Sequence, residues 1–191
     1  MVSLETARLA IRNFRSADWE ALHELIGQYE ASGLAVYDQP WPLSPEAIRQ
    51  VMQWFVRGDS YLAVCLKETD RCIGLVALTP ESQAEEIAAG PAFSLGYIFN
   101  FDYHGQGYAT EACRAVLAYA FERLQARQIV SGTAAANLAS CRLLERLGFQ
   151  RTGESISSFR CAPDGTPIRF IGYSFVLTRA RWRLVDKPRT A

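Results

Sequence analysis

The sequence predicts an α/β (α+β) fold built on one mixed, mostly antiparallel central sheet with flanking helices. Residues 93–134 follow the order strand, helix, strand, and such a unit joins two parallel strands through a right-handed crossover. Residues 61–79 and 150–178 each hold two strand patterns around a turn, which indicates antiparallel hairpins. Because parallel and antiparallel neighbours then share one sheet, the sheet is mixed.

The remaining boundaries follow from hydrophobic periodicity and from cap and turn residues. Ser44 followed by Pro45 is a strong helix start, and the trio at 163–165, Pro-Asp-Gly, is a strong turn signal. In chain order we expect strand 8–13, a helix capped by Ser16 and ending near Glu30, a helix from Ser44 to Gly58, strands 61–67 and 72–79 around a turn at 68–71, a loop at 83–91, strand 93–99, a helix from Ala109, strand 128–134, a helix capped by Asn137, and strands 150–160 and 168–178.

Length and composition indicate one domain. A chain of 191 residues with 49% hydrophobic content can bury a full core. We expect a single domain over 1–185 and a frayed tail over 186–191. The N-terminus lacks a charged region followed by an apolar run, and no apolar stretch is long enough to span a bilayer, so we expect a cytoplasmic protein that does not enter a membrane.

Charge and cysteine content exclude several classes of function. Lys plus Arg and Asp plus Glu both number 20, so the formal net charge of zero gives no general attraction to nucleic acid or to an anionic membrane. The five cysteines include no C-x-x-C pair, and the two histidines show no ligand spacing. We therefore expect no metal, and cysteines that serve mostly as small core residues.

A glycine turn within 97–111 is the first candidate for function. Gly105 and Gly107 lie between a strand and a helix whose N-terminus offers unpaired N–H groups and the positive end of the helix dipole, as a phosphate-binding loop does. A Walker loop is excluded because Tyr108 stands where it needs lysine, and Thr110 stands where a dinucleotide fingerprint places a third small residue. The alternative interpretation is that the turn is an ordinary connection between a strand and a helix.

A second cluster lies at 132–149. Asn137 is a suitable N-cap and Gly148 a suitable stop for a short amphipathic helix. At about 100° per residue, Ser140 shares one face with three apolar side chains: Leu143, Leu144 and Leu147. We therefore expect the Ser140 hydroxyl to point inward and to bond either to its own helix or to a ligand, because an unpartnered buried hydroxyl costs about 1–3 kcal/mol.

The two clusters resemble those of a known enzyme family. Residues 104–112 read H-G-Q-G-Y-A-T-E-A, and residues 137–149 read N-L-A-S-C-R-L-L-E-R-L-G-F. In this order they resemble the GNAT family of acetyl-coenzyme A dependent N-acetyltransferases, and within it the branch that acetylates ribosomal-protein N-termini. The segments at 4–12, 95–99 and 173–182 agree with this branch. The resemblance implies a GNAT-like sheet in which the parallel pair of strands splays apart.

The resemblance also implies a cofactor, acetyl-coenzyme A, and the residues that bind it. Pantetheine would lie in the splay against Tyr97, Ile98 and Phe99. The pyrophosphate would accept hydrogen bonds from a run of backbone N–H groups at the glycine turn: Gln106, Gly107, Tyr108, Ala109 and Thr110, with His104 and Gly105 shaping the entry. Asn137 and Ser140 match family positions that approach pantetheine and the sulfur.

The implied reaction moves the acetyl group to the primary amine of a peptide N-terminus or a small molecule, directly and without an acyl-enzyme. The backbone N–H near Ile98 would polarise the thioester carbonyl, and the Ser140 hydroxyl, with Asn137 beside it, would donate a proton to the leaving thiolate. No general base is assigned, because Ser94 stands where many relatives carry glutamate. An amine that is already deprotonated needs no base; the side chains that remain as candidates are Glu81, Glu85, Glu86, Tyr37 and Asp38.

Two other hypotheses remain open. Cys141 lies in the first turn of a helix, which can lower the pKa of a thiol, so it is a candidate acyl-accepting nucleophile. A non-catalytic acyl-coenzyme A sensor or interaction module of the same fold is the alternative from a different class, and the missing glutamate at Ser94 favours it.

The acceptor groove implied by the resemblance is walled by the loop between the first two helices and by the last hairpin. These segments carry aromatic and basic side chains: Tyr29, Tyr37, Trp41, Phe159, Arg160 and Arg169. Ordinary core packing also explains most of the aromatic residues. The chain is expected to be a monomer or a homodimer, and the last strands offer an edge for a dimer.

Overall fold

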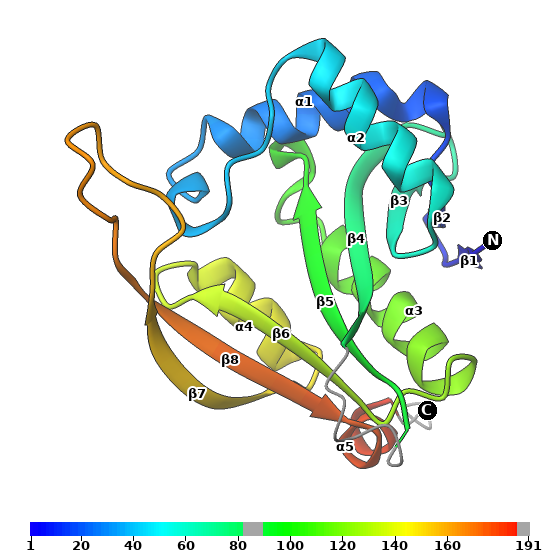
Figure 1. Cartoon of the computed structure of the whole chain (residues 1–191). Helices are drawn as coiled ribbons and strands as arrows, with labels where there is room; N and C mark the ends of the chain where they lie inside the picture. Colours follow the sequence, from blue (N-terminus) through cyan, green and yellow to red (C-terminus); the bar gives the residue numbers. More distant parts are fainter. Residues whose placement is uncertain (82–89, 187–191) are drawn as a thin grey trace.

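The structure is a computed structural model that describes residues 1–81 and 90–186. In these residues eight strands form one sheet in the order β1-β2-β3-β4-β5-β6-β8-β7 (Figure 1). The strands are β1 (Ser3–Glu5), β2 (Leu9–Asn13), β3 (Tyr61–Leu66), β4 (Cys72–Glu81), β5 (Ala92–Phe99), β6 (Gln128–Ala134), β7 (Gln150–Ser157) and β8 (Phe170–Thr178). The helices are α1 (Trp19–Glu30), α2 (Pro45–Arg57), α3 (Tyr108–Glu122), α4 (Leu138–Arg146) and α5 (Arg179–Val185), with short 3₁₀ turns η1 (Ser16–Asp18), η2 (Ala35–Tyr37) and η4 (Phe101–Tyr103).

The mixed, mostly antiparallel sheet that the sequence predicts is confirmed. Within the described chain, β5 and β6 pair in parallel, and the other neighbouring strands pair antiparallel. Helix α3 makes the crossover between the two parallel strands. The glycine turn therefore lies at the carboxyl end of β5, where a strand of a parallel pair delivers its chain to a helix.

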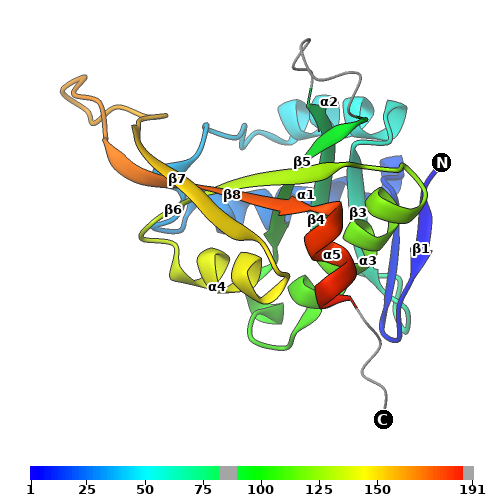
Figure 2. The same cartoon turned by 90° about the horizontal axis from the view of Figure 1, so that it is seen from below.

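The core lies in two layers, one on each face of the sheet. Helices α1 and α2 cover one face, and α3, α4 and α5 cover the other; Figure 2 shows α3, α4 and α5 together on one side of the strands. Helix α3 turns one apolar face to the sheet, and all five members of that face are fully buried: Ala112, Cys113, Val116, Leu117 and Ala120. The small side chains among them let the helix pack closely on the sheet.

Several predicted helix ends are confirmed by their hydrogen bonds. The Ser44 hydroxyl accepts from the backbone N–H of Ala47 at 3.2 Å, and Pro45 opens the helix. Gly148 adopts a φ of 95°, which suits the glycine stop expected there. Local rules identified these ends because each depends on residues close in sequence.

The structure corrects the predicted start of α1 and adds two elements. Ser16 opens η1 rather than capping α1, and it is the Asp18 carboxylate that accepts from the N–H of Arg15 at 2.7 Å. The sequence patterns did not indicate β1 or α5. Helix α5 is capped by Thr178, whose hydroxyl accepts from the Arg181 N–H, and the helix packs Trp182 on the core at 3% exposure.

The last hairpin is shorter than expected. Strand β7 ends at Ser157 and β8 begins at Phe170, so the residues between them form a long connection. Gly165, in the predicted turn, has a φ of 83°, which fits a glycine turn. Of the predicted tail over 186–191, all but Asp186 lies outside the described residues.

Two negative observations concern the described residues alone. In 1–81 and 90–186, no helix combines the length and the apolar character that crossing a bilayer requires. The same residues contain no group of three or more His, Cys, Asp or Glu side chains arranged to hold a metal ion.

Replacing Asp18 by asparagine is expected to destabilise the fold by about 3 kcal/mol. Arg12 and Asp18 form an ion pair of 2.7 Å with side chains only 11% and 10% exposed, and loss of Asp18 leaves the largely buried Arg12 charge with only a more distant, exposed carboxylate for compensation. Asp70 also contacts Arg12, at 3.5 Å, but is 63% exposed, so Asp70→Asn is expected to cost less than about 1 kcal/mol. Urea unfolding of both variants measures the difference, and equal losses would contradict the argument.

Candidate active site

The parallel strands β5 and β6 diverge after a short ladder. The ladder has three pairs: Ala92 with Gln128, Phe93 with Ile129, and Ser94 with Val130. Beyond it both strands continue without pairing to each other, and the Ser131 hydroxyl donates to the Leu95 carbonyl at 2.9 Å where they part. We call the diverging edges, 95–99 of β5 and 131–134 of β6, the wedge. The splayed pair implied by the resemblance is therefore confirmed.

The bonds between β5 and β4 decide which backbone groups face the wedge. The Asn100 N–H donates to the Ile73 carbonyl at 2.9 Å, and in a regular antiparallel ladder every second residue bonds to the same neighbour. The backbone N–H and C=O groups of Ile98 therefore point toward β4, whereas those of Tyr97 and Phe99 point toward the wedge. The N–H of Ile98 itself faces the neighbouring strand, so the backbone N–H groups near Ile98 that face the wedge are those of Tyr97 and Phe99.

The glycine turn has the geometry of an anion site. Gly105 and Gly107 have φ values of 75° and 84°, in the left-handed region that favours glycine. The first intrahelical bond of α3 runs from the Glu111 N–H to the Gly107 carbonyl at 3.0 Å, and nothing in the described chain accepts from the N–H groups of residues 106–110. The His104 ring contacts the Phe99 carbonyl at 3.0 Å, so it ties the turn to the end of β5.

A network that the sequence patterns did not indicate anchors this turn. The Glu111 carboxylate accepts from the Thr6 hydroxyl at 2.6 Å and from the Arg8 Nε at 2.8 Å. Arg8 also donates to the Gln106 carbonyl at 3.1 Å and lies over the Tyr108 ring at 4.2 Å. Burial raises the pKa of Glu111, but the bonds from Thr6 and Arg8 outweigh it, so the net shift is downward and the carboxylate stays ionised.

Ser140 and Tyr97 form a hydroxyl pair across the wedge. Their oxygens are 2.8 Å apart, so the Ser140 side chain does not bond back to its own helix but bridges to β5. Asn137 accepts from the Ser140 N–H at 3.1 Å and therefore caps α4 as predicted. Burial raises the pKa of Tyr97 well above its usual range, which keeps this hydroxyl protonated. The pair can relay a proton but cannot supply a phenolate near neutral pH.

The environment of Cys141 disfavours a nucleophile. The residue is 9% exposed, and its thiol lies 3.8 Å from the Ala134 carbonyl. Burial first, and then the charge of Glu145, raises the pKa of the thiol, whereas a nucleophilic cysteine needs a lowered one.

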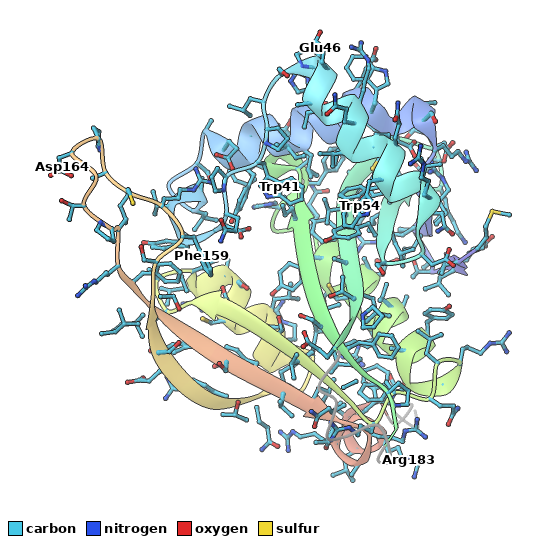
Figure 3. All side chains as sticks on the ribbon, in the orientation of Figure 1. Trp41, Glu46, Trp54, Phe159, Asp164 and Arg183 are labelled. Atoms are coloured by element: carbon cyan, nitrogen blue, oxygen red, sulfur yellow. The ribbon has the colours of Figure 1, made fainter. Side chains whose placement is uncertain are left out.

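The aromatic and basic residues expected at the acceptor groove mostly come together. The Arg160 guanidinium donates to both carboxylate oxygens of Glu30, at 2.7 and 2.8 Å, and the Glu30 carboxylate accepts from the Trp41 N–H at 2.9 Å. The Tyr37 and Phe159 rings each contact Phe170, while Arg169 is exposed. Figure 3 shows Trp41 and Phe159 near the upper end of the wedge, on the loop after α1 and on the connection after β7.

The candidate bases fall in different places. Ser94 lies in the paired part of β5, between Thr79 of β4 and Val130 of β6, and brings no carboxylate there. Glu81 is exposed at the end of β4, where it pairs with Ala92 at the start of the ladder between β5 and β6. Glu85 and Glu86 lie outside the described residues. Tyr37 and Asp38 lie in the loop between α1 and α2.

A family model described as acetyltransferase (GNAT) domain matches residues 8–150, which include both sides of the wedge and the glycine turn. The chain belongs to this GNAT family. This GNAT chain is 26% identical to the Uncharacterized N-acetyltransferase YnaD of Bacillus subtilis (strain 168) over 164 residues, which cover 85% of this chain and 89% of that protein.

Solved structures of GNAT proteins share the fold. An acetyltransferase (GNAT family) from Bacillus anthracis superposes with a TM-score of 0.77 at 24% identity, covering 94% of this chain and 99% of that one. The ribosomal-protein-S5-alanine acetyltransferase from Vibrio fischeri superposes with a TM-score of 0.74 at 20% identity, covering 95% and 99%. At these identities the two structures bear on the fold alone.

Proposed function

We propose that the chain is an N-acetyltransferase that moves the acetyl group of acetyl-coenzyme A to a primary amine by direct transfer in a ternary complex. The proposal rests on two features that lie next to each other at the carboxyl end of β5. The strand edge is open toward the wedge, and the turn that follows it presents a run of N–H groups. Membership of the GNAT family supports acetyl transfer in general.

The residues present fit acetyl-coenzyme A. The N–H groups of residues 106–110 are suited to the two phosphates, because a helix N-terminus attracts anions. The open edges of β5 and β6 are suited to the amide groups of pantetheine, which need backbone partners. We assign Tyr97 and Phe99 to this edge with Ile98 between them, and Asn137 and Ser140 to the side formed by α4.

The proposed chemistry uses groups that the fold holds in place. The N–H groups of Tyr97 and Phe99 face the wedge and would stabilise the oxyanion that forms when an amine attacks the thioester carbonyl. The Ser140 hydroxyl would donate a proton to the leaving thiolate and recover it through Tyr97. Asn137 would fix the first turn of α4, and so the direction of Ser140.

The acceptor is proposed to be a peptide N-terminus or a small-molecule amine. A protein N-terminus is included because the sequence resembles the branch that acetylates ribosomal-protein N-termini. The rings of Tyr37 and Phe159, which both contact Phe170, could pack against an amine on an aromatic or peptide body. A cytoplasmic location and a monomeric or homodimeric state stay predictions.

A non-catalytic acyl-coenzyme A sensor is the second candidate. The observation that favours it is Ser94, which offers no carboxylate at the position where the resemblance leads one to expect a base. Such a protein would bind acetyl-coenzyme A and release no thiol.

Thiol release from acetyl-coenzyme A tests the proposal. The acceptors are a panel of peptides, polyamines, amino acids and aminoglycosides, and calorimetric binding of the cofactor is measured beside them. We expect cofactor binding and thiol release that depends on at least one amine. Binding without release across the panel would favour the sensor. Cys141→Ala is expected to retain wild-type turnover, and its complete loss would favour an acyl-enzyme.

A further inference from the structure

The end of α1 and the loop that follows it lie across the open end of the wedge. On the side of β5, the Phe101 N–H donates to the Gln28 side chain at 2.9 Å, so α1 is tied to the residues that follow β5. On the side of β8, the Tyr37 ring contacts Phe170, the first residue of that strand, with ring centroids 5.2 Å apart. Asp38, the next residue of the loop, is therefore placed at the acceptor end.

A buried ion pair holds Asp38 in position. Arg160 binds both oxygens of the Glu30 carboxylate, and the two side chains are 19% and 8% exposed. The same guanidinium donates through Nε to the backbone carbonyl of Asp38 at 2.9 Å. Because Glu30 compensates the charge of Arg160, the arginine fixes the loop without neutralising the Asp38 carboxylate.

The Asp38 carboxylate itself has only neutral partners. It accepts from the Gln39 N–H at 2.8 Å and from the Tyr29 hydroxyl at 3.5 Å, and it makes no ion pair with any residue in the described part of the chain. Burial raises its pKa, and so does the charge of Glu30, while the bonds from Gln39 and Tyr29 and the charge of Arg160 lower it. The net shift is upward, so this carboxylate binds a proton more readily than an exposed one.

We propose that Asp38 receives the amine of the acceptor and takes its proton. The inference rests on the proposed transferase function and supplies the base that Ser94 does not. A partly buried carboxylate that lacks a cation of its own is suited to an ammonium group. The groups that face it are Tyr29 and Glu30 from α1 and Arg160 from the connection after β7.

The protons and electron pairs balance without a further reactant. The ammonium group gives one proton to the Asp38 carboxylate and becomes a neutral amine. The amine nitrogen forms a bond to the acetyl carbon, and the carbon–sulfur bond breaks. Ser140 gives the proton that the thiolate takes up. The nitrogen then passes its second proton to the Ser140–Tyr97 pair, which restores both hydroxyls. Asp38 then releases its proton to water.

Asp38→Asn is the test, and Asp164→Asn is its matched control. Asp164 carries the same change at the exposed tip of the connection between β7 and β8, where Figure 3 shows it pointing away from the wedge. We expect Asp38→Asn to lower kcat/KM for the amine by about 100-fold or more, because general base catalysis contributes about 10²- to 10⁴-fold. Its affinity for acetyl-coenzyme A should stay unchanged. Asp164→Asn should stay within about twofold of wild type, and Asp38→Glu should recover part of the loss.

The pH profile separates this role from a structural one. Wild-type kcat/KM should fall as the pH drops through the raised pKa of Asp38, because the base is lost on protonation. Asp38→Asn should lack this limb. An Asp38→Asn protein that melts like wild type and keeps its kcat/KM and pH profile would overturn the inference.

A binding experiment separates failure of this inference from failure of the transferase function. The same amines are titrated calorimetrically into the wild-type and Asp38→Asn proteins in the presence of coenzyme A. If wild type releases no thiol with any amine, the transferase proposal fails. Amine binding that weakens by about tenfold or more in Asp38→Asn would still support Asp38 as the amine site. Equal binding by both proteins, or no binding by either, would overturn it.

Discussion

Replacing Gly107 by alanine is expected to weaken acetyl-coenzyme A binding by about 10- to 100-fold. Gly107 has a φ of 84°, so a side chain there strains the turn and moves the N–H groups at the start of α3 away from the phosphates. A hydrogen bond to a charged group contributes about 1.5–3 kcal/mol, and each 1.4 kcal/mol changes a dissociation constant about tenfold. Isothermal titration calorimetry with acetyl-coenzyme A measures the change.

Gly165→Ala is the control for backbone strain. Gly165 has a φ of 83°, and an added Cβ there meets no atom within 4 Å. At Gly107 the added Cβ meets only the Arg8 guanidinium, at an ordinary contact distance of 3.5 Å. Both variants should therefore lose about 1 kcal/mol of unfolding free energy, and only Gly107→Ala should lose cofactor affinity. Equal affinities in the two variants would remove the glycine turn from the proposed cofactor site.

Replacing Ser140 by alanine is expected to lower kcat by about 100-fold with little effect on acetyl-coenzyme A binding. The physical reason is that the Ser140 hydroxyl, bridged to Tyr97 at 2.8 Å, is the protein group proposed to protonate the leaving thiolate. Single-turnover rates at saturating cofactor measure the step, and Ser174→Ala, at an exposed position on β8, is the control.

A double-mutant cycle tests whether the two hydroxyls act as one relay. Tyr97→Phe removes the partner of Ser140 and keeps the ring. If the pair relays one proton, the double variant should lose little more than Ser140→Ala alone, since the same step is already disabled. Additive losses would show that the two hydroxyls act separately, and an unchanged kcat in Ser140→Ala would remove serine from the proton path.

Local sequence rules predicted much of the fold and part of the candidate site. Gly107, Asn137 and Ser44 could be assigned because a turn or a cap depends on residues within a few positions. The apolar face of α3 could be predicted from periodicity for the same reason. Helix α5 is only 7 residues long and follows β8 directly, so its apolar residues show no distinct helical period.

The remaining site residues depend on contacts between distant parts of the chain. Arg8 reaches Glu111 across 103 positions, and Arg160 reaches Glu30 across 130. No local pattern marks such pairs, although Arg8 lies in a segment that resembles the family and Arg160 lies in a predicted wall of the acceptor groove. The direction of each N–H group on β5 could not be predicted for a related reason, because it depends on the register between β4 and β5 and not on β5 alone.

Transfer of a labelled acetyl group to an amine is the most direct test of the central claim. The protein is mixed with acetyl-coenzyme A that carries an isotopic label in the acetyl group and with the amine panel, and the products are examined by mass spectrometry within one turnover. Direct transfer predicts label on the nitrogen of an acceptor amine, in step with thiol release and with none on the protein. Bound cofactor that leaves every amine unlabelled would contradict the account.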